Sequence, residues 1–181
     1  MKPLSVRNLS LAALFAALTA VASQISIPLP FTPIPVNLAL LAVVLSGSLL
    51  GPVCGALSQL VFIALGAMGL PVFAGFHGGL SALAGPTGGF LVGYVLCSLL
   101  VGVLVRKPAR QKAPVTALCL TAGILLCYAL GVLWFMLLTG NGFIAALTLC
   151  VLPFLPGDAL KIIVATLLTR RLAHQPALYG Q

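Results

Sequence analysis

Apolar residues occur along the chain in long blocks that proline, glycine and charged residues separate. Six blocks are near the length that a helix needs to cross a bilayer, about 17–25 residues. They span about 8–26, 36–50, 53–69, 86–105, 115–139 and 156–172. The pattern predicts an all-α integral membrane protein, with one membrane domain over 1–181 and six transmembrane helices. A further stretch, FIAALTLCVL, is too short to span and predicts a short helix at the membrane edge.

The first block has one competing interpretation, a secretory signal peptide, because Lys2 and Arg7 precede it. The block is longer than a usual signal core, and the rest of the chain is equally apolar. We therefore expect it to be retained as the first membrane helix.

Composition agrees with a membrane protein, since 61% of the residues are hydrophobic and 6% are charged. Soluble domains carry about 25% charged residues. The net charge of +8 does not form a nucleic-acid-binding stripe, because the cations are confined to three flanks of apolar blocks. These flanks hold Lys2 and Arg7, then Arg106, Lys107, Arg110 and Lys112, then Arg170 and Arg171. The chain is expected to contact membrane lipid and no nucleic acid.

The cation clusters also orient the predicted helices. Lysine and arginine are enriched in cytoplasmic loops, and an even number of predicted spans separates the three clusters. Both termini are therefore expected in the cytoplasm. The loops at about 27–35, 70–85 and 140–155 carry no charge and are expected on the outer side.

The sequence offers little material for catalysis or for a metal. Its cysteines lie in apolar segments without a CxxC pair, and there is no GxxxxGK[ST] or HExxH motif. The five cysteines are Cys54, Cys97, Cys119, Cys127 and Cys150. We expect buried thiols, no cofactor, no metal and no enzymatic activity.

Asp158 is the only acidic residue in 181, and Lys161 follows it three positions later in PFLPGDALKII. This spacing places both side chains on one face of a helix. An ionisable group in a membrane segment is costly and usually serves a function. The alternative is that Asp158 caps the helix and neutralises Lys161.

Polar and aromatic residues of the uncharged outer loops complete a candidate pocket. They come from the proline-rich loop IPLPFTPIPVN and the glycine-rich loop GLPVFAGFHGGLSALAGPTGGF. Tyr94 lies one turn into the fourth predicted helix. The candidate residues are Phe31, Thr32, Asn37, Phe73, His77, Ser81 and Tyr94. His77 has a competing interpretation as an interfacial or helix-capping residue. Few polar groups among aromatic walls are typical of a site for a small amphipathic ligand.

Small residues recur on the first predicted helix at Ala12, Ala16 and Ala20, with Ala13 and Ala17 beside them. Small residues four positions apart let another helix approach closely. Two interpretations remain open: this face docks a partner protein, or it packs against the protein's own helices.

Three stretches together resemble the BioY family, the biotin-specific substrate-binding subunits (S components) of energy-coupling factor vitamin transporters. They are IPLPFTPIPVNLALLAVVLSGSLLG, GALSQLVFIALGAMGLPVFAGFHGGLSALAGPTGGFLVGY and LPGDALK. The similarity runs from about Leu9 to about Arg171. The combination of GLPVFAG, GPTGG and PGDxxK is specific, whereas each piece alone is weak.

The resemblance implies a six-helix bundle in a prokaryotic cytoplasmic membrane, with an outward-facing biotin pocket covered by loops. It implies that Asp158 and Lys161, the matched positions of PGDxxK, contact biotin. It further implies that the alanine face of the first helix docks a transmembrane coupling subunit, and that two separate ATPase subunits hydrolyse ATP.

The chain departs from the family pattern at two points. Phe76 and His77 stand where many relatives carry glycine or a small polar residue. No arginine occurs from Asn8 to Val105, so the outer loops offer none to the biotin carboxylate. Two alternative functions are an S component for another vitamin and an ion-coupled secondary carrier of a small organic anion.

Overall fold

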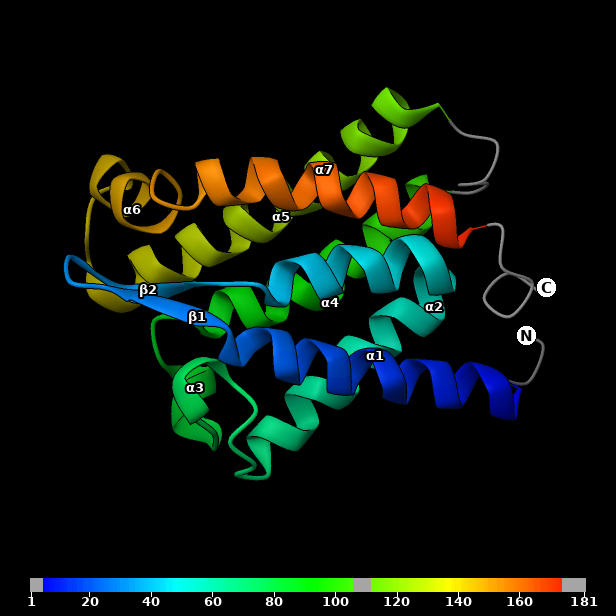
Figure 1. Ribbon diagram of the computed structural model, residues 1–181. Coiled ribbons are helices and arrows are strands. Elements are labelled where there is room, and N and C mark those ends of the chain that lie inside the picture. Colours follow the sequence, from blue (N-terminus) through cyan, green and yellow to red (C-terminus); the bar gives the residue numbers. More distant parts are fainter. Residues whose placement is uncertain (1–4, 106–111, 174–181) are drawn as a thin grey trace.

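The computed structural model describes residues 5–105 and 112–173, and most of them are helical. Five helices form a bundle, and the shorter elements gather at the end away from both termini (Figure 1). The bundle helices are α1 (Val6–Gln24), α2 (Ala39–Ala67), α4 (Gly88–Leu104), α5 (Ala113–Thr139) and α7 (Leu155–Leu172). The shorter elements are β1 (Ser26–Leu29), β2 (Thr32–Asn37), η1 (Ala74–Phe76), α3 (Leu80–Ala84) and α6 (Phe143–Cys150).

Three helices of the described chain, α1, α2 and α5, are long and apolar enough to cross a membrane. A fourth candidate arises if α6 and α7, which meet at a bend of 55°, are taken as one span. The helix α4 is apolar but shorter, with 17 residues. By length and composition the described residues therefore hold three or four candidate spans, against the six expected.

Part of this difference lies in α2, which changes direction at Gly51. Gly51 has φ 79° and ψ −179°, a conformation open essentially to glycine alone. Pro52 follows and lacks the N–H that would continue the helical hydrogen bonds. The two halves of α2 run in different directions, first toward the end with the termini and then back (Figure 1). The predicted break between the second and third apolar blocks is confirmed.

The core forms where α2 packs between α1 and α4. Buried apolar side chains on the first half of α2 include Val43, Val44 and Leu49. Gly47 lets α4 come close, since a Cβ there would lie 2.3 Å from the carbonyl oxygen of Ser98. This tight packing sets the positions of α2 and α4 at the end where the pocket lies.

The segment after α1 was expected to be a proline-stiffened loop, and this expectation was wrong. The strands β1 and β2 pair antiparallel, with Ser26 opposite Asn37 and Leu29 opposite Thr32. The prolines of this segment restrict φ and lack backbone N–H donors. The sequence therefore favoured a loop. The hairpin holds its outer face toward solvent and its inner face over the bundle.

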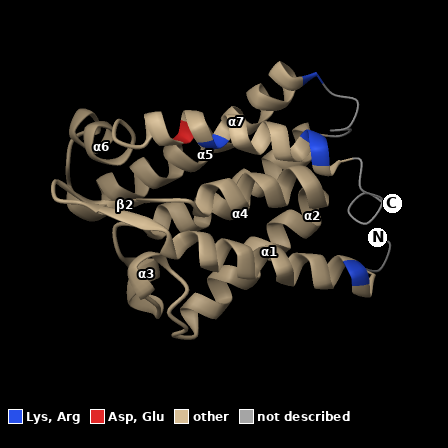
Figure 2. Cartoon of the chain, in the orientation of Figure 1, with Lys and Arg blue, Asp and Glu red and all other residues tan. Residues whose placement is uncertain are grey.

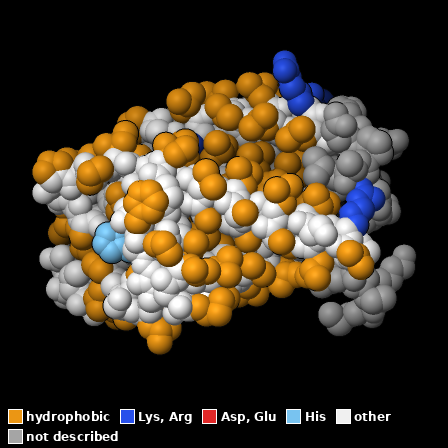
Figure 3. Space-filling model, turned by 60° about the horizontal axis from the view of Figure 1, so that its bottom comes forward, with side chains coloured by type: hydrophobic (Ala, Val, Ile, Leu, Met, Phe, Trp, Pro, Cys, Tyr) orange, Lys and Arg blue, Asp and Glu red, His pale blue; other side chains and the backbone are white. Residues whose placement is uncertain are grey.

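Charged side chains separate along the long axis of the molecule. Arg7, Lys112, Arg170 and Arg171 lie at the end that carries both termini, whereas the Asp158 and Lys161 pair lies toward the other end (Figure 2). Lys2, Arg106, Lys107 and Arg110 lie outside the described residues. Hydrophobic side chains cover much of the surface between the two ends (Figure 3). A surface of this kind suits contact with lipid.

Candidate functional site

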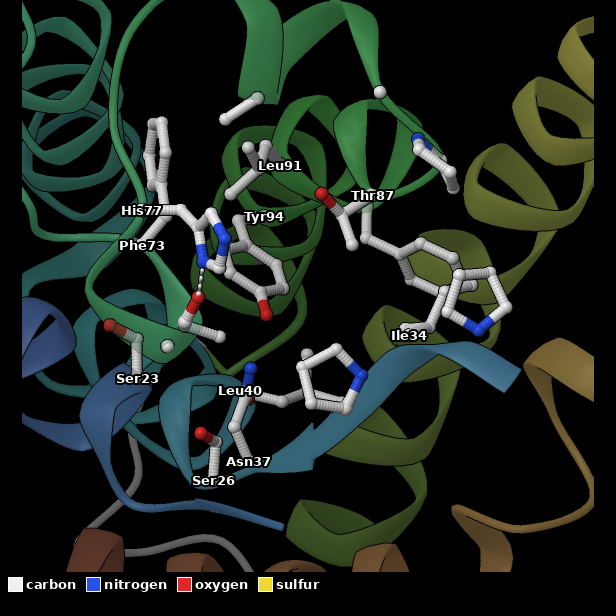
Figure 4. Close-up of a pocket in the computed structure, with 18 of the residues that line it drawn as sticks. Ser23, Ser26, Ile34, Asn37, Leu40, Phe73, His77, Thr87, Leu91 and Tyr94 are labelled. Carbon is white, nitrogen blue, oxygen red and sulfur yellow. Dashed lines mark hydrogen bonds between the residues drawn. The ribbon is translucent and has the colours of Figure 1, made fainter. Parts of the chain in front are cut away.

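A cavity of about 620 Å³ lies at the end of the bundle away from the termini. Its walls come from the β-hairpin, the segment 73–87 and the helices α2, α4, α5 and α7. Ligand pockets for small molecules usually enclose about 300–1,000 Å³. The close-up in Figure 4 shows Tyr94, Asn37 and His77 around the same space.

Asp158 and Lys161 stand together on α7, one helical turn apart. The Lys161 Nζ lies 2.6 Å from the Asp158 Oδ1, and the two residues are 3% and 7% exposed. Both line the cavity. The helical spacing in the sequence thus brought a buried ion pair to the pocket, as expected from the (i, i+3) positions.

The Asp158 side chain does not cap α7. No side chain caps this helix, and the backbone N–H of Asp158 donates to the carbonyl oxygen of Phe154 at 2.8 Å. The carboxylate turns instead to Lys161 and to Tyr128. The helix-capping part of the alternative is therefore wrong. Its other part, that Asp158 neutralises Lys161, agrees with the ion pair.

Tyr128 on α5 was missed in the sequence. Its hydroxyl donates to the Asp158 Oδ2, so each carboxylate oxygen has its own donor. The residue is buried and lines the cavity. The available signal was a hydrogen-bonding side chain in the middle of a long apolar block, where polar groups usually have a partner.

Six of the predicted loop and helix residues line the cavity, and one does not. The six are Thr32, Asn37, Phe73, His77, Ser81 and Tyr94. Phe31 lies in the turn of the hairpin and is 59% exposed, outside the lining. The side chains of a strand alternate between faces, and here Thr32 and Ile34 take the buried face. Phe31 precedes this strand, and its contact with a ligand stays a prediction.

The polar groups of the lining are mostly neutral. Asn37 accepts a hydrogen bond from the backbone N–H of Ala39 at 3.1 Å through Oδ1, while its side chain lies within hydrogen-bonding reach of the Tyr94 hydroxyl. The His77 Nδ1 lies 3.0 Å from the carbonyl oxygen of Ala74, and its ring is exposed at the cavity edge. The Asn37 amide offers a donor to a ligand without adding a fixed charge, whereas the His77 Nδ1 already donates to the Ala74 carbonyl oxygen.

Aromatic side chains make up much of the remaining wall. Phe62 and Phe73 pack edge to face, with ring centroids 5.4 Å apart and planes at 80°. Phe90 and Phe154 were not expected from the sequence and line the cavity too. The result is an apolar chamber with an ion pair in its wall, an arrangement suited to a ligand with one polar and one apolar part.

The alanine face of α1 is internal. Ala12 and Ala16 are each 1% exposed, and Ala20 packs against the core. The interpretation of this face as a docking surface is therefore replaced by the alternative, packing inside the chain. The neighbouring pair Ala13 and Ala17 is exposed, because a step of one residue turns an α-helix by about 100°.

Comparison with known proteins decides the family. The model of the BioY family matches residues 1–177, almost the entire chain. The chain belongs to the BioY family. This membership agrees with the motifs GLPVFAG, GPTGG and PGDALK, whose residues meet around the cavity.

Relatives within the BioY family are similar over nearly their full lengths. The "Probable biotin transporter BioY" of Pyrococcus horikoshii is 38% identical over 169 residues, which cover 93% of this chain and 98% of the relative. The "Biotin transporter BioY" of Rhodobacter capsulatus is 39% identical over 179 residues, with 93% and 94% covered.

A solved structure shares the fold. It is described as the crystal structure of the S-component for biotin from an ECF-type ABC transporter. It superposes with a TM-score of 0.88 at 28% sequence identity, covering 97% of this chain and 95% of its own. At 97% coverage the superposition takes in nearly all of the chain, from the hairpin to the bundle helices.

Proposed function

We propose that this chain is the biotin-binding S component of an ATP-driven vitamin importer in a prokaryotic cytoplasmic membrane. The observation that carries the proposal is the buried Asp158 and Lys161 pair in the wall of an apolar cavity, in a chain of the BioY family. The names of the relatives and of the solved structure support biotin as the ligand.

The chemistry of biotin matches the pair. The ureido ring of biotin presents two N–H donors and one carbonyl acceptor. The Asp158 carboxylate can accept from the N–H groups, and the Lys161 ammonium can donate to the carbonyl oxygen. Tyr128 donates to the other carboxylate oxygen and thereby orients the group. The aromatic wall then packs against the sulfur-containing ring and the alkyl chain.

The carboxylate end of biotin is assigned to the neutral side of the cavity. Asn37, His77 and Ser81 lie there, between the hairpin and the segment 73–87. Lys161 is the one lysine among the lining residues, which include no arginine, and it is already paired with Asp158. Neutral donors and water therefore solvate the carboxylate.

Six short spans with both termini in the cytoplasm remain our proposed topology. Counting the two halves of α2 separately, and taking α4 as a span, supplies the additional crossings. Apart from Lys161, which pairs with Asp158, the Lys and Arg residues of the described chain lie at the end with the termini (Figure 2), as cytoplasmic flanks do. The cavity then faces the outside of the cell.

Energy for transport is assigned to partner proteins, a transmembrane coupling subunit and two ATPase subunits. The solved relative is described as part of an ECF-type ABC transporter. Since Ala12 and Ala16 are internal, we assign docking to the exposed Ala13 and Ala17 on the same helix. The chain itself binds the ligand and hydrolyses no ATP.

The test is ligand binding by the purified full-length protein in detergent. Titration calorimetry is expected to give a biotin dissociation constant below about 1 μM. Tight binding of thiamine or riboflavin without biotin binding would identify another vitamin S component. Uptake of an organic anion by the chain alone in vesicles, abolished when the ion gradient is collapsed, would identify a secondary carrier.

A further inference from the structure

Gln24, the last residue of α1, is hydrogen-bonded to a wall of the cavity that lies far along the chain. The two Nε2 protons are shared among four acceptors: the carbonyl oxygens of Phe73 at 3.1 Å, Pro71 at 3.4 Å and Ala20 at 3.4 Å, and the Ser23 hydroxyl at 3.1 Å. The Gln24 Oε1 accepts from the backbone N–H of Phe76 at 3.0 Å. One amide side chain therefore connects α1 to three positions of the segment 70–79, which we call the pocket loop.

Ser23 strengthens the same connection. Its single hydroxyl proton is shared between the carbonyl oxygen of Val72 and that of Ala20 at 2.7 Å within α1, and its oxygen accepts from the Gln24 Nε2 at 3.1 Å. The last two residues of α1 thus contact the loop backbone at four positions, Pro71, Val72, Phe73 and Phe76.

The pocket loop has a backbone that needs such support. Phe76 has φ 59° and is the one non-glycine residue of the described chain with positive φ. A bulky residue in this region is disfavoured. Gly75 beside it has φ 72°. The bond from the Phe76 N–H to Gln24 stabilises this conformation against the extended alternatives.

The loop forms the cavity wall, whereas Gln24 does not. Phe73, His77 and Gly78 line the cavity. The ring of Phe73 packs directly against Gly66 of α2, where an added Cβ would lie 2.0 Å from the nearest ring atom. The wall is therefore held between α2 on one side and the amide of Gln24 on the other.

We propose that Gln24 is a positioning residue for the ligand site, resting on the proposed function of the cavity as a biotin site. It holds the pocket loop in the shape that encloses the ligand, and it makes the cavity wall move with α1. Ligand release then requires the Gln24 bonds to break, or α1 and the loop to move together.

The test compares ligand dissociation from the purified full-length protein and its variants. Gln24→Met keeps the length of the side chain and removes its hydrogen bonds. Gln24→Glu keeps the acceptor for the Phe76 N–H and removes both donors. We expect the release of radiolabelled biotin into excess unlabelled biotin to become about tenfold faster in Gln24→Met, because several hydrogen bonds are lost. Gln24→Glu is expected to accelerate release as well.

Gln59→Met is the matched control. Gln59 is buried and donates to Ser46 at 3.1 Å and to Ser58 at 3.0 Å, inside the bundle. The substitution Gln59→Met removes a comparable set of hydrogen bonds, and these bonds do not involve the pocket loop. We expect a changed melting temperature and a biotin release rate within about twofold of the original chain.

Hydrogen exchange measured by mass spectrometry gives a readout that needs no ligand. The peptide covering 70–79 is expected to exchange faster in Gln24→Met and unchanged in Gln59→Met, since opening of the loop exposes its amides. If biotin binds, and both release and loop exchange stay at the original values in Gln24→Met, the positioning role is wrong and the proposed function stands.

Other outcomes separate the two proposals equally well. If the original chain binds no biotin, the proposed function fails, and the exchange measurement still decides whether Gln24 holds the loop. If Gln24→Met does not yield folded protein, Gln24→Glu decides by the same two readouts. Unchanged release and exchange in that variant would overturn the inference.

Discussion

The Tyr128 hydroxyl and the Lys161 ammonium divide the Asp158 carboxylate between them, one donor on each oxygen. Two helices thus hydrogen-bond one buried carboxylate: α5 supplies the phenol of Tyr128, and α7 itself supplies the amine of Lys161. A buried carboxylate with two donors is held in one orientation. It lines the cavity, where its remaining lone pairs can accept hydrogen bonds.

Replacement of Asp158 tests this assignment most directly. Asp158→Asn removes the charge that accepts the ureido N–H groups and leaves Lys161 without its ion partner. We expect biotin affinity to fall by about 2 kcal/mol or more, close to 30-fold. Titration calorimetry measures it. Unchanged affinity together with a lower melting temperature would assign the pair to stability alone.

Tyr128→Phe removes one donor and keeps the ring. Since Lys161 still compensates the carboxylate, the expected loss of biotin affinity is smaller, about 1 kcal/mol or fivefold. The double variant with Asp158→Asn gives the check. Tyr128→Phe should have less effect in that background, because residues in contact are coupled. Equal effects in both backgrounds would mean that Tyr128 acts independently of Asp158.

The neutral carboxylate end predicts tolerance for biotin derivatives. Biotin methyl ester lacks the negative charge, and Lys161 is the one cation of the lining. We expect its affinity to lie within about 1 kcal/mol of that of biotin, a factor near five. Competition against radiolabelled biotin measures the ratio. A loss of about 100-fold or more would show that Lys161 holds the carboxylate instead.

The two alanine pairs of α1 predict opposite results for the same substitution. Ala17→Trp on the exposed face should leave biotin binding unchanged and prevent co-purification with the coupling subunit. Ala16→Trp places an indole in a 1% exposed position and should lower the melting temperature, because overpacking costs about 1–3 kcal/mol. Assembly that survives Ala17→Trp would remove this face from the docking surface.

The break in α2 predicts a glycine-specific effect on stability. Gly51→Ala forces a Cβ into φ 79° and ψ −179°, at a cost of about 1–3 kcal/mol. Gly142→Ala is the matched control, since its φ of −66° suits any residue and nothing lies within 4 Å of the added Cβ. Thermal unfolding in detergent compares the two. Equal melting temperatures would contradict the requirement for glycine at 51.

Local patterns predicted the features that depend on neighbouring residues. The helical spacing of Asp158 and Lys161 placed both on one face, and Gly51 followed by Pro52 marked the change of direction in α2. Both follow from the geometry of a few consecutive residues, so the sequence alone contains the information.

Features that depend on distant pairing escaped prediction. The hairpin forms because Ile27 lies opposite Val36, and its prolines hide this pairing in the sequence. Tyr128 meets Asp158 from another helix. The alanines of α1 present two adjacent faces, and only the packing of α2 shows which one, that of Ala12 or that of Ala13, is covered.

Compensation of Asp158 by Lys161 has an electrical consequence. The two charges cancel 2.6 Å apart, so the empty cavity carries no net charge from its described lining. Moving one uncompensated charge through a membrane potential of 100 mV requires about 2.3 kcal/mol. A neutral cavity performs no such work when it changes position within the membrane.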